Sequence, residues 1–408
     1  MQKILSLSVA LAMAALSSSA QKRIYVNEYL NIGVGARGLG MGGAQSASTS
    51  DVTAGYWNPA GLSNITNDLQ VGLMHAEYFS GNAKYDYLSI AKPLADKKRT
   101  VGFSALRFAT DDIAYTIDYI QPDGSFDDSK LKSISAGDYA FMFHYSQKVK
   151  IFKQDFDDND DIETSFGVNA KVLYRHIGKM ANAWGGGLDF GLQGKYGQWR
   201  FGIMAKDITT TTTSWSFHLT EKEKQVFGET GNEIPVKSNE VMLPRLSLGL
   251  GRMLSKPTAD LSLLAEFNAD ITTDGKRSTL VATNAFSVDP RLGLEVGYKN
   301  IVYVRGGIGN IQRVLDNADT TNTKKVTMMQ PSAGLGLRIN SLSIDYAFTT
   351  LLAQDNPLPS HVVSLRLAIT RPDADVRDAR RNGSSSKSSS GNGRDPKQKS
   401  NRQTFRKR

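Results

Sequence analysis

Hydrophobic and polar residues alternate with a period of two along much of the chain between residues 69 and 369. In segment 188–196 (LDFGLQGKY), the apolar residues and Gly194 share one face, and Asp189, Gln193 and Lys195 share the other. Segments 245–251, 291–298, 332–339 and 363–369 repeat this alternation. Because successive side chains of a strand point to opposite faces, the pattern predicts β-strands.

About fourteen strands are predicted, an even number, as bacterial membrane barrels have. Several apolar faces end in aromatic residues, such as the pairs Trp199/Phe201 and Tyr346/Phe348. Such aromatics resemble the girdles that flank the lipid-facing band of a barrel. The predicted strands begin near Leu69, Lys84, Arg99, Asp138, Thr164, Trp184, Gln198, Met242, Ala259, Pro290, Ile301, Pro331, Leu342 and His361.

The connections between these strands alternate in length. Short ones are expected near 95–98, 196–197, 255–258, 299–300 and 340–341, and long ones near 109–137, 207–241, 271–289, 310–330 and 350–360. Outer-membrane barrels have short periplasmic turns and longer outer loops. The pattern therefore predicts an all-β fold, a transmembrane antiparallel barrel over residues 68–370 with its outer face in outer-membrane lipid. A soluble, exported β-sandwich that adheres or binds a ligand is the alternative, because its strands alternate too.

The N-terminus has the three parts of a secretory signal peptide, predicted over residues 1–20. Lys3 precedes an apolar stretch from Ile4 to Leu16, and Ser18-Ser19-Ala20 offers small residues for cleavage. That stretch is shorter than the roughly 20 residues that a membrane-spanning helix needs. No later segment reaches this length, and the chain has no Cys that could form a disulfide.

The composition changes sharply at Arg371. Residues 371–408 contain 12 Lys or Arg and 4 Asp or Glu, a net +8 of the chain's +9, with two Gly/Ser runs. Such a segment cannot bury enough apolar surface to fold alone, which predicts a disordered basic tail in the periplasm. Export disfavours nucleic acid as its partner, so an anionic periplasmic component is expected, with no partner as the alternative.

Residues 21–67 form a compact, glycine-rich segment before the first strand. It contains 35–44 (GARGLGMGGA) and 51–62 (DVTAGYWNPAGL). Small residues allow close backbone packing, and Asn-Pro begins turns, so the segment is predicted to fold into the lumen as a plug or hatch. The candidate plug residues are Gly35, Arg37, Gly38, Gly40, Asp51, Tyr56, Trp57, Asn58, Pro59, Ala60 and Gly61.

This segment resembles the N-terminal motif of the FadL-type outer-membrane barrel superfamily. The shared features are a small-residue run, an acidic residue and the aromatic-Asn-Pro-Ala-Gly-Leu signature, here at 57–62. The run at 35–44 and the ending at 345–348 and 361–365 more closely resemble the PorV/PorQ family, which serves the type IX secretion system of Bacteroidetes. The resemblance covers the N-terminal segment well, the last two strands loosely and the middle in pattern alone.

The resemblance to the PorV/PorQ family implies a non-enzymatic shuttle or accessory barrel in type IX protein secretion. Its implied partners are the secretion translocon barrel and the C-terminal sorting domains of cargo proteins. FadL-type relatives instead take up hydrophobic small molecules, which is the alternative function. The basic tail departs from the pattern, because barrels commonly end on their last strand.

Little in the sequence indicates catalysis or a cofactor. The five His are dispersed, and no nucleophile–base arrangement stands out. Asp155, Asp157 and Asn159 fit the start of a calcium loop. However, position six is Asp160 in place of Gly and position twelve is Phe166 in place of Glu, which favours a solvated acidic turn.

Charged residues on the polar strand faces are predicted to point into the lumen. They carry both signs, so ion pairs that fill the lumen are favoured over a selective pore lining. The candidates are Arg245, Glu266, Arg291, Glu295, Arg338, Asp345 and Arg366.

Overall fold

The computed structural model describes residues 26–119, 125–150, 162–256, 259–275, 277–315, 325–351 and 358–370. The predicted signal peptide, the calcium candidates Asp155, Asp157 and Asn159, and the predicted tail lie outside these residues. The helices are η1 (Glu28–Asn31), α2 (Ala36–Gly40), α3 (Ala54–Trp57), η2 (Pro59–Asn64), η3 (Asp128–Lys130) and α4 (Glu221–Glu229). The strands are β1 (Leu69–Tyr78), β2 (Ala83–Pro93), β3 (Arg99–Tyr115), β4 (Lys132–Val149), β5 (Glu163–Ile177), β6 (Ala181–Tyr196), β7 (Trp199–Lys206), β8 (Thr211–Phe217), β9 (Ser238–Met242), β10 (Arg245–Met253), β11 (Leu261–Thr272), β12 (Val281–Ala282), β13 (Ser287–Tyr298), β14 (Val302–Leu315), β15 (Lys325–Ile339), β16 (Leu342–Leu351) and β17 (Leu358–Ile369).

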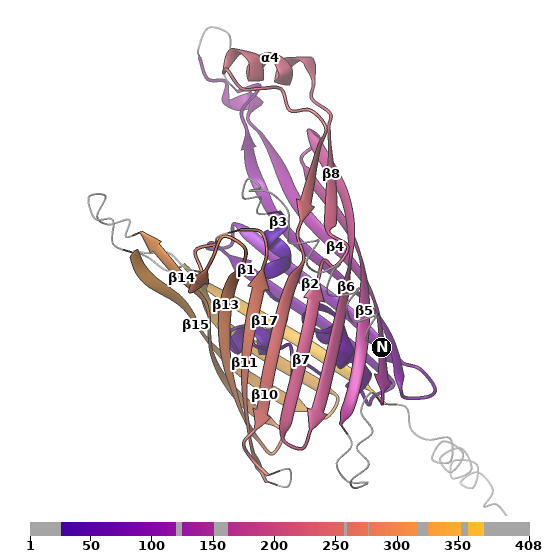
Figure 1. The fold of residues 1–408 in the computed structure, drawn as a ribbon. Coiled ribbons are helices and arrows are strands. Elements are labelled where there is room, and N and C mark those ends of the chain that lie inside the picture. The colour runs from indigo at the N-terminus through magenta and orange to yellow at the C-terminus, as the bar shows by residue number, and fades with distance from the viewer. Residues whose placement is uncertain are drawn as a thin grey trace, which may run out of the picture. The chain divides into compact units, whose positions relative to one another are not determined.

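Within the described residues, fourteen strands form a closed antiparallel barrel (Figure 1). Their order around the barrel is β1, β2, β3, β4, β5, β6, β7, β10, β11, β13, β14, β15, β16 and β17, and β17 pairs back onto β1. Closure satisfies the backbone hydrogen bonds that an open sheet edge would leave unpaired in lipid. The predicted fourteen-stranded transmembrane barrel is therefore confirmed.

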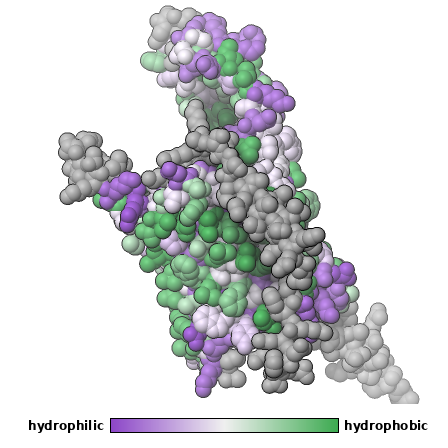
Figure 2. Space-filling model, viewed as in Figure 1, coloured by the Kyte–Doolittle hydropathy of each residue, from purple (hydrophilic) through white to green (hydrophobic). Residues whose placement is uncertain are grey.

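The outer face of the barrel is apolar. On β6, Leu188 is exposed on this face, while Asp189 and Gln193 are buried on the inner one. Figure 2 shows the resulting hydrophobic surface over the strands, which has the character of a lipid-facing belt. Other exposed outward residues are Leu73, Leu88, Phe143, Val172, Ile203, Leu250, Leu294, Val304, Leu335 and Leu365.

One end of the barrel, here the short-turn end, carries tight connections. The predicted turns at 299–300 and 340–341 lie here, and Lys299, Asn300 and Asn340 adopt positive φ of 50°, 57° and 51°. Such backbone angles suit the short hairpin turns that match the twist of their strands. The opposite end is called the loop end. Its β1–β2 connection, residues 79–82, is also short, so the predicted alternation of loop lengths does not hold there.

The predicted long loop at 207–241 is wrong, because it contains β8, α4 and β9. In β8 the side chains of Thr213 and Trp215 are buried on one face, which continues the period-two pattern. The helix α4 begins with a capping box in which Thr220 and Glu223 satisfy each other's backbone groups, a signal that the sequence carries.

Together with the upper ends of β3 to β6, the elements β8, β9 and α4 form a wall extension at the loop end (Figure 1). The predicted loop at 109–137 is likewise partly strand, because β3 and β4 pair here up to Tyr115 and Lys132. Residues 207–210 separate β7 from β8, and Asp207 is buried there beside Lys171. The Lys171 ammonium also lies 2.7 Å from Asp189, so one cation compensates two buried carboxylates at this break.

Candidate functional site in the barrel lumen

Residues 26–65, here the plug, lie inside the barrel. They carry η1, α2, α3 and η2, and most of their side chains are buried. The helix α2 packs against β14 to β17, and η2 packs against β3 to β6. The plug therefore touches both sides of the lumen and separates the loop end from the short-turn end.

The inner wall meets the plug at a set of glycines, where the two backbones are in contact. A Cβ atom added at Gly202 would lie 2.1 Å from the Ser46 carbonyl oxygen, and one at Gly307 would lie 2.2 Å from the Gly42 nitrogen. Such distances leave no room for any side chain, so these wall positions require glycine. The other wall glycines in contact with the plug include Gly72, Gly167, Gly191, Gly249 and Gly293.

Within the plug, two aromatic side chains hold the segment that precedes them. The Tyr56 hydroxyl donates to the Leu30 carbonyl at 2.7 Å and accepts from the Gly33 N–H at 3.0 Å. The Trp57 indole donates to the Val34 carbonyl at 2.9 Å. These bonds satisfy backbone groups that the plug's irregular path leaves without secondary-structure partners.

Asn58 connects the plug with the wall. Its side-chain amide donates to the carbonyls of Ser46 at 2.8 Å and of Leu192 on β6 at 2.9 Å, and its oxygen accepts from the Ala60 N–H. The Ala60 carbonyl in turn accepts from Ser146 on β4 at 2.9 Å. The Asn-Pro-Ala-Gly signature thus forms a hydrogen-bonded junction between plug and barrel, beyond the turn that the sequence suggested.

The other small residues of the motif allow close packing. Gly35 has a φ of +78°, and a Cβ at Gly38 would lie 2.8 Å from the Trp57 indole nitrogen. Similarly, a Cβ at Gly61 would lie 2.3 Å from the Thr49 carbonyl oxygen, and Gly40 contacts Gly334 of β15. Pro59 and Ala60 are buried against β5, where Gly167 faces them.

Ion pairs tie the plug to the wall. Arg37 makes two hydrogen bonds to the Glu295 carboxylate, at 2.8 and 3.0 Å. The same carboxylate accepts from Arg305 at 2.7 Å, and Arg305 also reaches Asp345 at 2.7 Å. On the neighbouring side of the plug, Asp51 pairs with Arg366 of β17.

The structure distributes the seven predicted lumen-facing residues over three places. Arg245 and Arg291 line a cavity on the loop side of the plug, here the upper cavity. Glu266 is buried against the plug and accepts from the Ala47 N–H at 2.8 Å. Glu295, Arg338, Asp345 and Arg366 line a second cavity of about 350 Å³ on the short-turn side, here the lower cavity.

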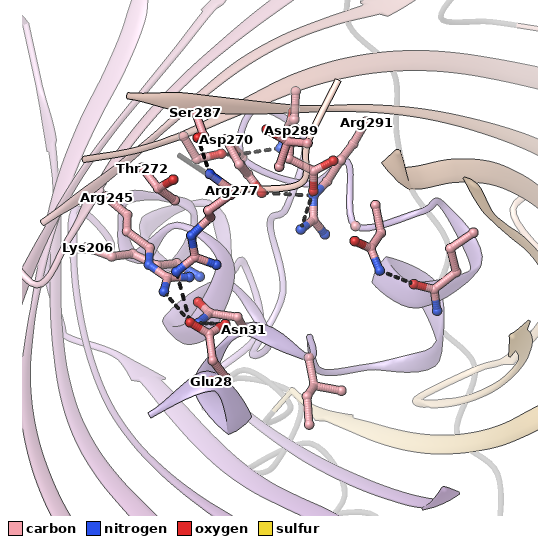
Figure 3. Close-up of a pocket in the computed structure, with 18 of the residues that line it drawn as sticks. Glu28, Asn31, Lys206, Arg245, Asp270, Thr272, Arg277, Ser287, Asp289 and Arg291 are labelled. Carbon is pink, nitrogen blue, oxygen red and sulfur yellow. Dashed lines mark hydrogen bonds and ion pairs between the residues drawn. The ribbon is translucent and has the colours of Figure 1, made fainter. Parts of the chain in front are cut away.

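The upper cavity has a volume of about 490 Å³ and combines charged and aromatic surfaces. Figure 3 shows Arg245 and Arg277 converging on Glu28 of η1. One Glu28 oxygen accepts from Arg245 at 2.7 Å and from Arg277 at 3.0 Å, while Asn31 donates to the other at 3.1 Å. Two arginines of the wall region thus already bind a carboxylate that belongs to the plug.

A second charged group and an aromatic surface complete the upper cavity. Arg291 lies 2.8 Å from Asp270 and 3.2 Å from Asp289 (Figure 3). The Lys206 ammonium lies 4.5 Å from the centre of the Tyr56 ring, a cation–π contact. The apolar lining consists of Ile32, Leu39, Tyr56, Trp57, Tyr78 and Leu246.

Sequence reasoning did not single out Glu28, Lys206, Arg277, Asp270 or Asp289. Lys206 and Asp270 lie at strand ends and Asp289 lies within β13, but Arg277 lies in the β11–β13 connection, and Glu28 precedes the recognised motif. The continued alternation at the ends of β7 and β11 could have indicated Lys206 and Asp270. No local pattern indicates the pairing of Glu28 with Arg245, which is 217 residues away.

Among the described residues, no cluster of His, Asp and Glu has the arrangement of a metal site. In the same part of the chain, no helix is long and apolar enough to span a membrane.

No protein-family profile matches the chain, and no curated protein matches it in sequence. Among solved structures, the fold is similar to the CymD monoaromatic hydrocarbon channel, with a TM-score of 0.52, 14% identity, and coverage of 83% of this chain and 98% of that one. The Ralstonia pickettii toluene transporter TbuX has a TM-score of 0.48, 12% identity, and coverage of 83% and 98%. A Pseudomonas aeruginosa FadL homologue has a TM-score of 0.44, 13% identity, and coverage of 82% and 97%. The likeness to CymD shows that the chain shares the barrel fold of that channel.

Proposed function

We propose that the chain is a plugged outer-membrane channel that takes up small molecules with an apolar body and an acidic headgroup. The observation that carries this proposal is the upper cavity, where Arg245 and Arg277 bind a carboxylate next to an aromatic surface. Ligand sites commonly combine an apolar lining with a few polar groups that orient the ligand. The hydrocarbon-channel fold of CymD supports transport as the general role.

In this proposal, the Glu28 carboxylate occupies the position of a ligand headgroup. An incoming carboxylate competes with Glu28 for Arg245 and Arg277, and its apolar part packs against Tyr56 and Trp57. Displacement of Glu28 releases η1 from its anchor on Arg245 and Arg277 at the wall. Tyr56 and Trp57 also hold the backbone of residues 30–34, so the ligand contacts the side chains that position the rest of this segment. Binding in the upper cavity is thereby coupled to a change in the plug, which must move before a solute can pass.

Uptake by cells that lack this chain tests the proposal. The deletion strain, with and without the intact chain restored, is given a labelled medium-chain fatty acid and the matched alcohol. Restored uptake that is larger for the acid supports the proposal. Equal uptake by the deletion and restored strains contradicts it.

Glu28→Gln is expected to tighten the binding of carboxylate ligands about tenfold. The variant removes the internal competitor while keeping its size, and a charge-assisted hydrogen bond contributes roughly 1.5 kcal/mol. Quenching of tryptophan fluorescence by a titrated fatty acid measures the effect, because Trp57 lines the cavity. Glu221→Gln on α4, an exposed acid of the wall extension, is the control and should leave the affinity unchanged. Unchanged affinity in Glu28→Gln would show that this carboxylate does not compete.

The secretion role remains a second candidate, favoured by the wall extension. It gives the loop end a surface built from strands and a capped helix, which suits a protein partner better than a small solute. A tagged pull-down from detergent-solubilised outer membranes tests it. Recovery of a translocon barrel or of secreted proteins with C-terminal sorting domains would support this role, and recovery of the barrel alone would count against it.

The basic tail is proposed to contact an anionic periplasmic component, and its removal in the same experiment tests that contact.

A further inference from the structure

The lower cavity holds more arginines than acids. Its lining brings together Arg37 of the plug with four arginines of the barrel wall, and it contains three carboxylates. The arginines are Arg37, Arg200, Arg305, Arg338 and Arg366, and the acids are Asp51, Glu295 and Asp345.

Three of the five arginines form ion pairs with the three acids. Arg37 and Arg305 share Glu295, and Arg305 also holds Asp345. Arg366 pairs with Asp51 and donates to the Ser343 hydroxyl at 3.1 Å. The pairs of Arg37 with Glu295 and of Asp51 with Arg366 join the plug to the wall, and Arg305 connects Glu295 with Asp345 within the wall, so these acids are committed to the structure of the barrel.

Arg200 and Arg338 make no ion pair with any residue that the structure describes. The Nε of Arg200 is buried and has no hydrogen-bond partner in the part of the chain that the structure describes. Arg338 lies over the Tyr303 ring at 5.3 Å, a contact that leaves its N–H donors free for an acceptor in the cavity. The lining of the cavity therefore has two more arginines than carboxylates, and the buried Glu266, outside this lining, interacts with Arg200 electrostatically without forming an ion pair among the described residues.

Arg200 is half-buried, where a charge without an ion pair is costly, and Arg338 lines the same cavity as an exposed side chain. A guanidinium group presents its donors as a planar fork, which matches the oxygens of phosphate and carboxylate. The volume of about 350 Å³ leaves room for a small solute beside the paired residues. Asn300 and Tyr303 add polar groups at the short-turn side of the same cavity.

We propose that the lower cavity is a binding site for a small dianionic oxyanion, with Arg200 and Arg338 as its principal ligands. A dianion such as phosphate matches the excess of two arginines over carboxylates in the lining. The site lies on the opposite side of the plug from the upper cavity and has no aromatic cluster like that of Tyr56 and Trp57. It therefore takes a different, more hydrophilic class of ligand than the one proposed for uptake.

Calorimetric titration of the purified full-length barrel with inorganic phosphate tests this site, at constant ionic strength and with chloride as the monovalent comparison. We expect saturable binding of phosphate and a loss of at least tenfold in affinity in Arg200→Gln and in Arg338→Gln. The control is Arg252→Gln, also near the short-turn end, because Arg252 is exposed over an aromatic ring like Arg338 but does not line the lower cavity. The Arg252→Gln variant should bind phosphate with the affinity of the unaltered protein.

The heat-dependent shift in gel mobility that marks a folded barrel verifies that each variant is assembled. Phosphate binding that is absent, or that is unaffected by Arg200→Gln and Arg338→Gln in folded protein, overturns the proposal. Loss of affinity in Arg252→Gln equal to that in Arg200→Gln overturns it as well, because the effect then reflects surface charge. The titration involves no transport, so its outcome is independent of the uptake experiment.

Discussion

Replacing Glu295 by glutamine is expected to loosen the plug and to open a measurable conductance through the barrel. The Glu295 carboxylate binds Arg37 of the plug and Arg305 of β14, and these side chains are 12%, 18% and 3% exposed. Removing the negative charge leaves the Arg37 guanidinium without its ion pair, next to Arg305, which keeps its pair with Asp345, in a poorly solvated place. Breaking a buried ion pair in this way costs roughly 3–5 kcal/mol.

Single-channel recording in planar lipid bilayers measures the conductance, and urea unfolding in lipid vesicles measures the free energy. Glu163→Gln is the matched control, because Glu163 pairs with Lys195 at 3.4 Å and both side chains are largely exposed. Exposed pairs contribute about 0–1 kcal/mol, so the control should behave like the unaltered barrel. If Glu295→Gln stayed closed and equally stable, the ion pairs between plug and wall would not be what retains the plug.

A single methyl group at Gly307 is expected to displace the plug, whereas the same change at the adjacent Gly306 is expected to have no effect. The Cβ of Gly307→Ala would lie 2.2 Å from the backbone of residues 41 and 42, so the backbone must shift. At Gly306, which faces outward between the exposed Val304 and Ile308, no atom of the described residues lies within 4 Å of the added atom. Overpacking of this kind costs about 1–3 kcal/mol.

Limited proteolysis of the reconstituted barrel measures the displacement. We expect cleavage within residues 35–62 to accelerate in Gly307→Ala and to remain slow in Gly306→Ala, while both variants keep the gel mobility of a closed barrel. Equal cleavage rates in the two variants would mean that the plug does not rest on β14 as described.

Much of the barrel could be predicted from local pattern, because the environment of a strand residue repeats every second position. The alternation at 188–196 correctly separated the exposed Leu188 from the buried Asp189 and Gln193. The elements of the wall extension were missed. Their alternation is short and is interrupted at residues 207–210, and the capping box at Thr220 and Glu223 is a short local signal.

Two adjacent glycines of β14 show what the local alternation of residues cannot predict. Gly306 and Gly307 are neighbours of the same residue type, but one faces lipid and the other rests on the plug. The period of two assigns them to opposite faces, but it does not indicate that a backbone approaches one of them. The requirement for glycine at position 307 comes from the plug residues Met41 and Gly42, more than 260 residues earlier in the chain.

The sequence by itself determined the strand count, the lipid-facing residues and the small-residue plug motif, because each depends on neighbours within a few positions. The tertiary structure alone decided which charges meet. Arg37 pairs with Glu295 across 258 residues and Glu28 pairs with Arg245 across 217, while Arg200 and Arg338 line one cavity without an ion pair among the described residues. Closure of the barrel around the plug brings these side chains together, and no local preference of the chain encodes a contact over such distances.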